Sequence, residues 1–236
     1  MAVASREKNP SVAFLEPYAK WRASRLGRIT DALEEELILE VAGDVAGRRM
    51  LDVGGGDGKL VQLFARKQAQ VTIMDMDSRM LDAVRHRFAD AGLPVETVEG
   101  DAARLPFPDN SFDIVTVVTV LCFVEDAGQA VAEMARVLRP GGVLLLGELN
   151  RYSLWAAWRR LRGWLGSATW RSVHFRTPAG LKKLVVRAGL RVTVLRAAVF
   201  YPPFGWAAAL SRSVDLKIGR HLSFGGAFLV LEASKP

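Results

Sequence analysis

The residues best suited to hold a ligand lie in a glycine-rich run that begins at Asp52. An acidic residue is followed there by glycines at every second position, in the order Asp52, Gly54, Gly56 and Gly58. Glycine has no Cβ and adopts positive φ readily, so a ligand can come close to the backbone of such a turn. A dinucleotide fingerprint counted from Gly54 would need its third glycine at residue 59, which is Lys59. The spacing therefore argues against a dinucleotide site.

The segments on either side of this run predict the element that carries it. Arg49–Val53 is short and apolar, as expected for a buried strand, and a helical pattern begins at Lys59. The N-terminus of a helix presents backbone N–H groups that have no partner within the helix, and these groups favour a polar or anionic ligand. We therefore expect a strand-to-helix turn whose backbone lines a ligand site.

The spacing acidic-x-Gly-x-Gly-x-Gly resembles motif I of the class I S-adenosylmethionine (SAM) methyltransferases. In that family the acidic residue holds the methionine amino group, and the glycines line the methionine and ribose portions of the cofactor. The resemblance implies these roles for Asp52, Gly54, Gly56 and Gly58. It also implies SAM as the cofactor and S-adenosylhomocysteine as the product. The alternative is a tight turn in an unrelated α/β protein.

Two more acidic residues follow the next two predicted strands. Asp75 comes directly after Val71–Met74, and Asp101 follows Val95–Glu99. Ligands of open α/β sheets bind beyond the carboxyl ends of the strands, so we expect both side chains near the glycine-rich turn. The resemblance implies that Asp75 accepts hydrogen bonds from the ribose hydroxyls and that Asp101 pairs with the adenine amino group. Each acidic residue could instead cap a helix or lie in a solvated loop.

The resemblance assigns further cofactor contacts in other parts of the chain. They come from an N-terminal cap, from the residues after the second and third strands, and from the end of the fourth strand. For the N-terminal segment, a plain amphipathic helix on the edge of the sheet is the alternative. The remaining predicted cofactor-binding residues are Tyr18, Trp21, Met76, Ala102, Val118, Thr119 and Phe123.

A continuous helical pattern runs from Phe14 to about Val45, and strands and helices then alternate as far as Leu149, which predicts an α/β fold with a doubly wound parallel sheet. The fourth and fifth strands are predicted at Phe112–Val118 and Val143–Leu149, and two of the helices at Ser78–Ala91 and Ala127–Leu138. Two more strands are predicted at Arg191–Phe200 and Ala227–Ala233. With these, the resemblance implies a Rossmann-like sheet of seven strands, mostly parallel, with an antiparallel last strand. We expect one SAM-methyltransferase domain over residues 1–236, consisting of a helical cap (1–47), a cofactor-binding core (48–149) and two insertions that form an acceptor-side lid (150–176 and 200–226).

Composition limits the other ligands and the cellular location. The 236 residues include one cysteine and three widely spaced histidines, so no metal-ligand pattern is present and we expect no metal site. We see neither a secretory signal nor a long uncharged apolar run. We therefore expect a cytoplasmic protein, and the alternative is a peripheral position at the inner membrane face.

The chain carries a net charge of +7, and this charge is concentrated after the fifth strand. From Leu149 through Val214 there is no Asp or Glu, which suggests an anionic partner. A predicted helix at Ser153–Leu165 is rich in Trp and Arg. Three interpretations stay open for this segment: a lid helix with its apolar face on the domain, a peripheral membrane contact through 151–165, and an RNA-binding surface.

The acceptor must be inferred mainly from motifs that are missing. The end of the fourth strand, Val118–Leu121, lacks the Asn/Asp-Pro-Pro-aromatic motif of amino-methylating nucleic-acid enzymes, and Cys122 is not part of a Pro-Cys pair. Nucleic acid is therefore an unlikely partner, and we expect a small hydrophobic, amphiphilic or anionic acceptor. His174 and Tyr152 are the candidate catalytic residues. The alternatives are a membrane-associated quinone or lipid methyltransferase, an RNA methyltransferase, and a regulatory protein that binds SAM without turnover.

Overall fold

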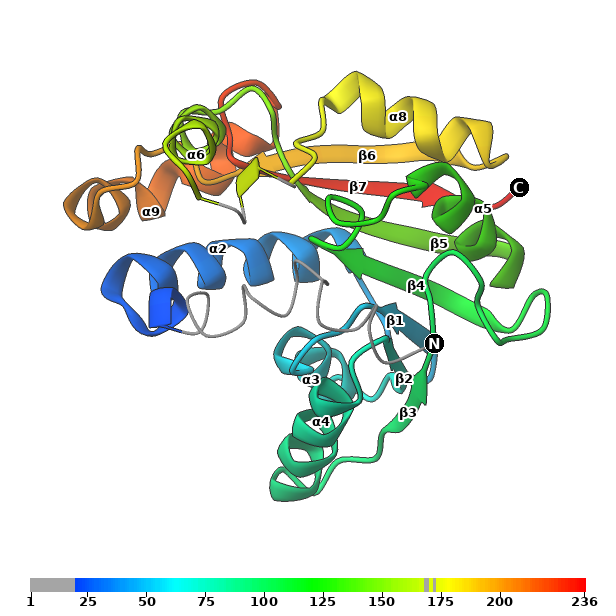
Figure 1. Cartoon of the computed structure of the whole chain (residues 1–236). Helices are drawn as coiled ribbons and strands as arrows, with labels where there is room; N and C mark the ends of the chain where they lie inside the picture. The colour runs from blue at the N-terminus through cyan, green and yellow to red at the C-terminus, as the bar shows by residue number, and fades with distance from the viewer. Residues whose placement is uncertain (1–19, 168–169, 172) are drawn as a thin grey trace.

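The computed structural model describes residues 20–167, 170–171 and 173–236, and these fold around one seven-stranded sheet (Figure 1). The strand order is β3-β2-β1-β4-β5-β7-β6, and β7 pairs antiparallel with both of its neighbours. The predicted fold class is therefore confirmed, including the antiparallel last strand. The strands are β1 (Arg49–Val53), β2 (Gln70–Asp75), β3 (Glu96–Glu99), β4 (Phe112–Val118), β5 (Leu138–Leu149), β6 (Arg191–Ala198) and β7 (Phe228–Ser234).

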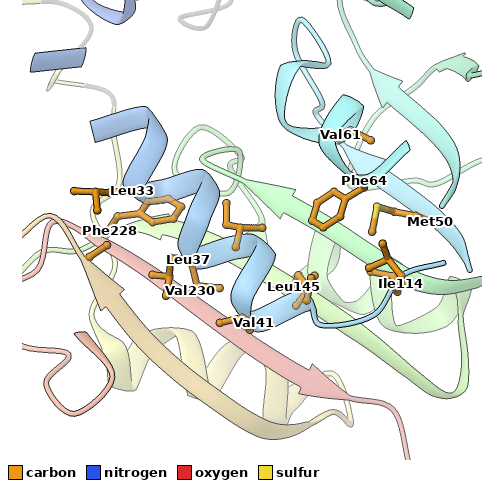
Figure 2. Close-up of a cluster of buried hydrophobic side chains, with 14 of the residues drawn as sticks. Leu33, Leu37, Val41, Met50, Val61, Phe64, Ile114, Leu145, Phe228 and Val230 are labelled. Carbon is orange, nitrogen blue, oxygen red and sulfur yellow. The ribbon is translucent and has the colours of Figure 1, made fainter. Parts of the chain in front are cut away.

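Helices cover both faces of the sheet. One buried cluster joins α2, α3 and α4 to one face, and a second cluster joins α5 and α8 to the other, as expected for a doubly wound fold. Figure 2 shows Leu33, Leu37 and Val41 of α2 lying against Phe228 and Val230 of β7. The helices are α2 (Arg25–Ala42), α3 (Lys59–Arg66), α4 (Ser78–Asp90), α5 (Ala127–Val137), α6 (Leu154–Trp164), α8 (Pro178–Arg187) and α9 (Gly205–Gly219).

Most predicted elements have bounds within two residues of the prediction, and two elements differ by more. The fifth strand was expected from Val143, but β5 begins at Leu138, because the segment around Gly141 continues the strand with one residue at positive φ. The expected continuous N-terminal helix is interrupted at Ser24, whose side chain accepts a hydrogen bond from the Gly27 N–H and so caps α2. Tyr18 lies outside the described residues.

Elements α6 and α9 lie at the same end of the molecule, beyond the end of β6 and the start of β7 (Figure 1). The Asn150 side chain links the segment before α6 to the loop after α9, because its amide donates to the Ser223 and Gly226 carbonyls at 3.0 and 2.7 Å. The Trp155 indole donates to the Tyr201 carbonyl at 2.8 Å, which holds α6 against the segment that precedes α9. In the described part of the chain, no helix is long and apolar enough to cross a membrane.

Candidate functional site

A cavity of about 260 Å³, the main cavity, lies at the carboxyl ends of the central strands. This is where open α/β sheets bind their ligands. The glycine-rich loop after β1, the segments after β2 and β3, and the end of β4 all contribute to its wall. The predicted cofactor residues that line it are Trp21, Gly54, Gly56, Asp75, Met76, Asp101, Ala102, Val118, Thr119 and Phe123.

Two of the described cofactor candidates do not line the main cavity. Asp52 is 4% exposed and lines an adjoining cavity of about 310 Å³. Gly58 is buried at the N-cap of α3 with φ of 71°. The two cavities meet at shared residues, which are Glu34, Gly54, Gly56, Met80, Val118 and Thr119.

The glycine-rich loop is held in place by Asp75. One oxygen of the Asp75 carboxylate accepts the Gly56 N–H at 3.0 Å, and the other accepts the Asp77 N–H at 2.9 Å. Gly56 has φ of 53°, and no atom lies within 4 Å of the position that a Cβ would occupy there. A carboxylate oxygen can accept more than one hydrogen bond, so Asp75 can bind hydroxyl groups in the cavity while it holds the loop.

Asp52 lies beneath the loop and accepts a hydrogen bond from the Thr116 hydroxyl. Burial raises the pKa of Asp52 to about 7; the Thr116 hydrogen bond opposes this shift and the negative charge of Asp75 adds to it. The carboxyl group is therefore costly to ionise without a positive partner. A ligand ammonium group would supply that partner.

Ion pairs hold the N-terminal helix against the loop. Lys59, at the start of α3, lies 2.7 Å from an Asp31 oxygen and 2.6 Å from a Glu35 oxygen, both on α2. Arg22 also pairs with Asp31, at 2.8 Å. This network fixes the position of α2, and therefore of Glu34, beside the two cavities.

Glu34 lines both cavities, and it was not among the predicted site residues. Its pKa is raised to about 8, mainly because burial removes water and also because the negative charge of Asp31 is close. A carboxyl group with a pKa near the working pH is suited to accept a proton during catalysis. Its place depends on how α2 docks, so residue spacing alone could not have identified it.

One part of the main cavity lining is aromatic and basic. The Arg159 guanidinium lies 5.0 Å from the Trp155 ring centroid and 4.8 Å from that of Trp170, within cation–π range of both. Arg159 and Trp170 line the main cavity together with Trp21 and Leu149. This part of the cavity can hold a partly apolar molecule that carries an acidic or polar group.

Thr119 also lines the main cavity and has an unusual backbone conformation. Its φ is 54°, a value that is uncommon for a β-branched residue. The Thr119 N–H donates to the Gly147 carbonyl at 2.8 Å, and its hydroxyl donates to the Val118 carbonyl at 2.8 Å. Such conformations cluster at functional sites, where the surrounding structure maintains them.

The two predicted catalytic residues lie elsewhere. His174 is exposed and lines a separate cleft of about 640 Å³ whose wall includes Arg151, Arg160, Arg171 and Arg176, here called the arginine-lined cleft. Tyr152 is 49% exposed, and its ring centroid lies 5.9 Å from that of Phe224. Neither residue lines the main cavity, so their catalytic roles stay predictions without support from its geometry. Within the described residues, no group of three or more His, Cys, Asp or Glu side chains is placed to hold a metal ion.

Comparisons by sequence agree with this geometry. Residues 51–146 match the family model described as "Methyltransferase domain". Over 124 residues the chain is 40% identical to the ubiquinone/menaquinone biosynthesis C-methyltransferase of Pseudomonas putida, a match that covers 50% of this chain and 48% of that protein. The chain thus spans about half the length of the curated relatives it matches.

Comparisons by structure extend over nearly the whole chain. A SAM-dependent methyltransferase of Thermotoga maritima has a TM-score of 0.71 at 22% identity, covering 95% of this chain and 97% of that one. The cyclase SpnF has a TM-score of 0.63 at 21% identity, covering 86% and 81%. At these identities the similarity shows a shared fold only. One of the two neighbours is named as a methyltransferase and the other as a cyclase.

Proposed function

We propose that this chain, as a member of the class I SAM-dependent methyltransferase superfamily, transfers the SAM methyl group to a small, amphiphilic acceptor. The observation that carries the proposal is the convergence of Gly56, Asp75 and Asp101 on one cavity. These residues come from three separate segments: Gly56 follows β1, Asp75 ends β2 and Asp101 follows β3. The cavity therefore has the composition that the cofactor requires at the strand ends where it is expected.

The residues around the main cavity fit SAM in chemistry as well as in position. We assign the ribose hydroxyls to Asp75, the adenine to Met76, Asp101 and Ala102, and the methionine portion to Gly54, Gly56, Gly58 and buried Asp52. The unfilled space at Gly56 supports close approach to the backbone. The raised pKa of Asp52 supports a cationic partner, because an ammonium group would restore the charged form of the carboxyl.

Methyl transfer then requires that the acceptor be positioned against the SAM methyl group and that water be excluded. An acceptor that carries a proton on the attacking atom also requires a base. When bound, SAM supplies an electrophilic methyl group on a sulfonium sulfur. Trp21 and Trp170 exclude water from the aromatic and basic part of the main cavity, and positioning of this kind lowers the barrier of a bimolecular displacement. We assign Glu34 as the carboxylate that accepts the proton lost by the acceptor, because it lines both cavities beside Thr119.

The class of acceptor follows from the aromatic and basic part of the main cavity. Arg159 favours an acidic or strongly polar group, and the aromatic rings of Trp21 and Trp170 favour an apolar or aromatic body. A quinone or lipid precursor has this combination, and the name of the Pseudomonas putida relative points in the same direction. We assign residues 150–176 and 200–226 to the acceptor side of a single domain.

Acceptor profiling tests the proposal. The purified protein would be incubated with methyl-labelled SAM and fractionated cell extract, and the labelled products identified by mass spectrometry. We expect label in a small organic-soluble molecule, with S-adenosylhomocysteine formed in equal amount. Label in RNA would assign a different acceptor class. Binding of SAM without S-adenosylhomocysteine in any fraction would contradict the proposed turnover.

A further inference from the structure

Helix α6 turns an apolar stripe away from the rest of the described chain. Residues Trp155, Ala156 and Gly163 are buried, and Arg159 lines the main cavity, so these four define the inner face. The opposite face carries large apolar side chains at the spacing of one helical face, each between 43% and 78% exposed. This outer stripe consists of Leu154, Trp158, Leu161 and Leu165.

Helix α9 repeats the arrangement at the same end of the molecule. Every fourth residue along it is apolar and at least 42% exposed, in the order Trp206, Leu210, Val214 and Ile218. The loop after α9 reaches the start of α6, where Phe224 packs against Tyr152 and the Gly225 N–H donates to the Tyr152 carbonyl at 2.9 Å. We name the two apolar rows, together with Tyr152 and Phe224, the α6–α9 surface.

The charged groups along and beside α6 are basic. Arg151, Arg160, Arg162 and Arg171 are exposed beside α6, and three of them line the arginine-lined cleft next to Trp164. The sequences of α6 and α9 contain one acidic residue, Asp215. It is 1% exposed, and its carboxylate accepts the Val199 and Phe200 N–H groups at 2.7 and 2.8 Å. An occupant of the surface must therefore combine apolar contacts with negative charge.

Three kinds of occupant can be compared on these grounds. In a symmetric dimer the same patch would face itself, which brings the arginine clusters of two copies together. RNA would pair with arginine and stack on tryptophan, but the aliphatic side chains Leu161, Leu165 and Leu210 offer bases no stacking platform. A lipid bilayer with anionic headgroups satisfies both requirements, since acyl chains accept the apolar rows and phosphates accept the arginines.

We propose that the α6–α9 surface binds the interface of an anionic lipid bilayer. The apolar rows enter the boundary between headgroups and acyl chains, and the arginine-lined cleft receives lipid phosphate groups. The same helix supplies Arg159 to the main cavity, so the bilayer lies next to the acceptor side of the site. That last placement rests on the proposed function, whereas membrane binding itself does not.

A vesicle flotation experiment tests the proposal without any activity measurement. The full chain would be mixed with vesicles of phosphatidylcholine, or of equal parts phosphatidylcholine and phosphatidylglycerol. We expect flotation with the anionic vesicles and a blue shift of tryptophan emission. The double variant Leu161→Asp with Leu165→Asp should lose affinity for these vesicles by about tenfold or more. Val186→Asp is the matched control, because Val186 is 58% exposed on α8, away from this surface, and its binding should equal that of the unchanged protein.

The remaining outcomes also decide between the occupants. SAM affinity and circular dichroism, unchanged in all variants, would show that the fold is intact. Failure of the unchanged protein to float with anionic vesicles would overturn the proposal. So would an equal loss of binding in Val186→Asp. A concentration-dependent dimer that the double variant abolishes would instead assign the surface to a second copy of the chain, and RNA binding without vesicle binding would assign it to nucleic acid. Because each readout is independent of methyl transfer, membrane binding can fail while the proposed function stands.

Discussion

The Asp75 carboxylate accepts a hydrogen bond from the Gly56 N–H at 3.0 Å. The two residues lie 19 positions apart, since Gly56 follows β1 and Asp75 ends β2. Asp75 therefore has two functions in the proposed site, because it holds the glycine-rich loop in position and presents a carboxylate to the main cavity. Loss of the Asp75 side chain should therefore weaken cofactor binding by releasing the loop and by removing the carboxylate from the cavity.

We expect Asp75→Ala to weaken SAM binding by about tenfold to a hundredfold, which is the range for hydrogen bonds to a charged group. Isothermal titration calorimetry measures this change directly. Asp82→Ala is the control, since Asp82 lies on α4, is 64% exposed and pairs with Arg85 outside the cavity. Equal affinity in the Asp75 variant and the unchanged protein would remove Asp75 from the ribose role.

Gly56→Ala should weaken SAM binding by roughly tenfold or more, because the added Cβ would occupy space that the cofactor needs. The control is Gly43→Ala. Gly43 has a similar φ of 62° and equally open surroundings, but it lies at the C-cap of α2 outside both cavities. Both variants should lose about 1 kcal/mol of stability because alanine disfavours positive φ. If SAM affinity falls equally in the two, backbone strain explains the effect and the close approach at Gly56 is wrong.

Glu34→Gln should lower kcat by about a hundredfold or more when the acceptor must lose a proton. The carboxyl group acts as a base only when it is ionised, and its pKa is about 8, so kcat/KM of the unchanged enzyme should rise with pH up to that value. The variant should lack this rise. Glu36→Gln, an exposed position on the same helix, is the control. A retained pH dependence in Glu34→Gln would place the base elsewhere, with His174 the next candidate.

Asp52→Asn should stabilise the protein at alkaline pH while it weakens SAM binding. The pKa of Asp52 in the folded state, about 7, lies above its ordinary value of 3.8. Its contribution to stability is therefore full below pH 3.8 and is lost as pH rises through 7. Asparagine stays neutral, so the variant should gain about 1–3 kcal/mol at pH 8 and little at pH 4. Urea unfolding at the two pH values measures this difference.

The comparison for that experiment is Asp82→Asn, which removes a solvent-exposed carboxylate. It should leave the pH dependence of stability unchanged. If Asp52→Asn shows the same dependence as the unchanged protein, then Asp52 is ionised in the folded state without cost, and the argument for an ammonium partner fails.

Local pattern predicted the central sheet well. Strands β1 and β4 have the predicted bounds, and the ends of α4 and α5 differ from prediction by one residue. Buried parallel strands are short apolar runs bounded by turn residues, and helices are bounded by caps and glycines, so both are visible in a single sequence. The start of β5 was missed, because the Pro-Gly-Gly turn signal lies inside a strand that tolerates one residue at positive φ.

The acceptor side could not be predicted to the same degree. Glu34 comes to the cavities because ion pairs between Lys59 and two acidic residues of α2 fix that helix against α3. Such contacts join residues far apart in the chain, and no spacing rule reports them. His174 was a predicted catalytic residue, and the fold places it in the arginine-lined cleft.

The sequence by itself determined where the proposed cofactor site lies. A glycine turn after β1 and acidic residues after β2 and β3 must meet, because the carboxyl ends of parallel strands lie along one edge of the sheet. Tertiary structure alone decided the orientation of α6. Helical periodicity shows which residues share a face, but not which face finds a partner. Trp155 turned inward because Trp21 and the Tyr201 carbonyl receive it, and the larger apolar stripe was therefore left outside.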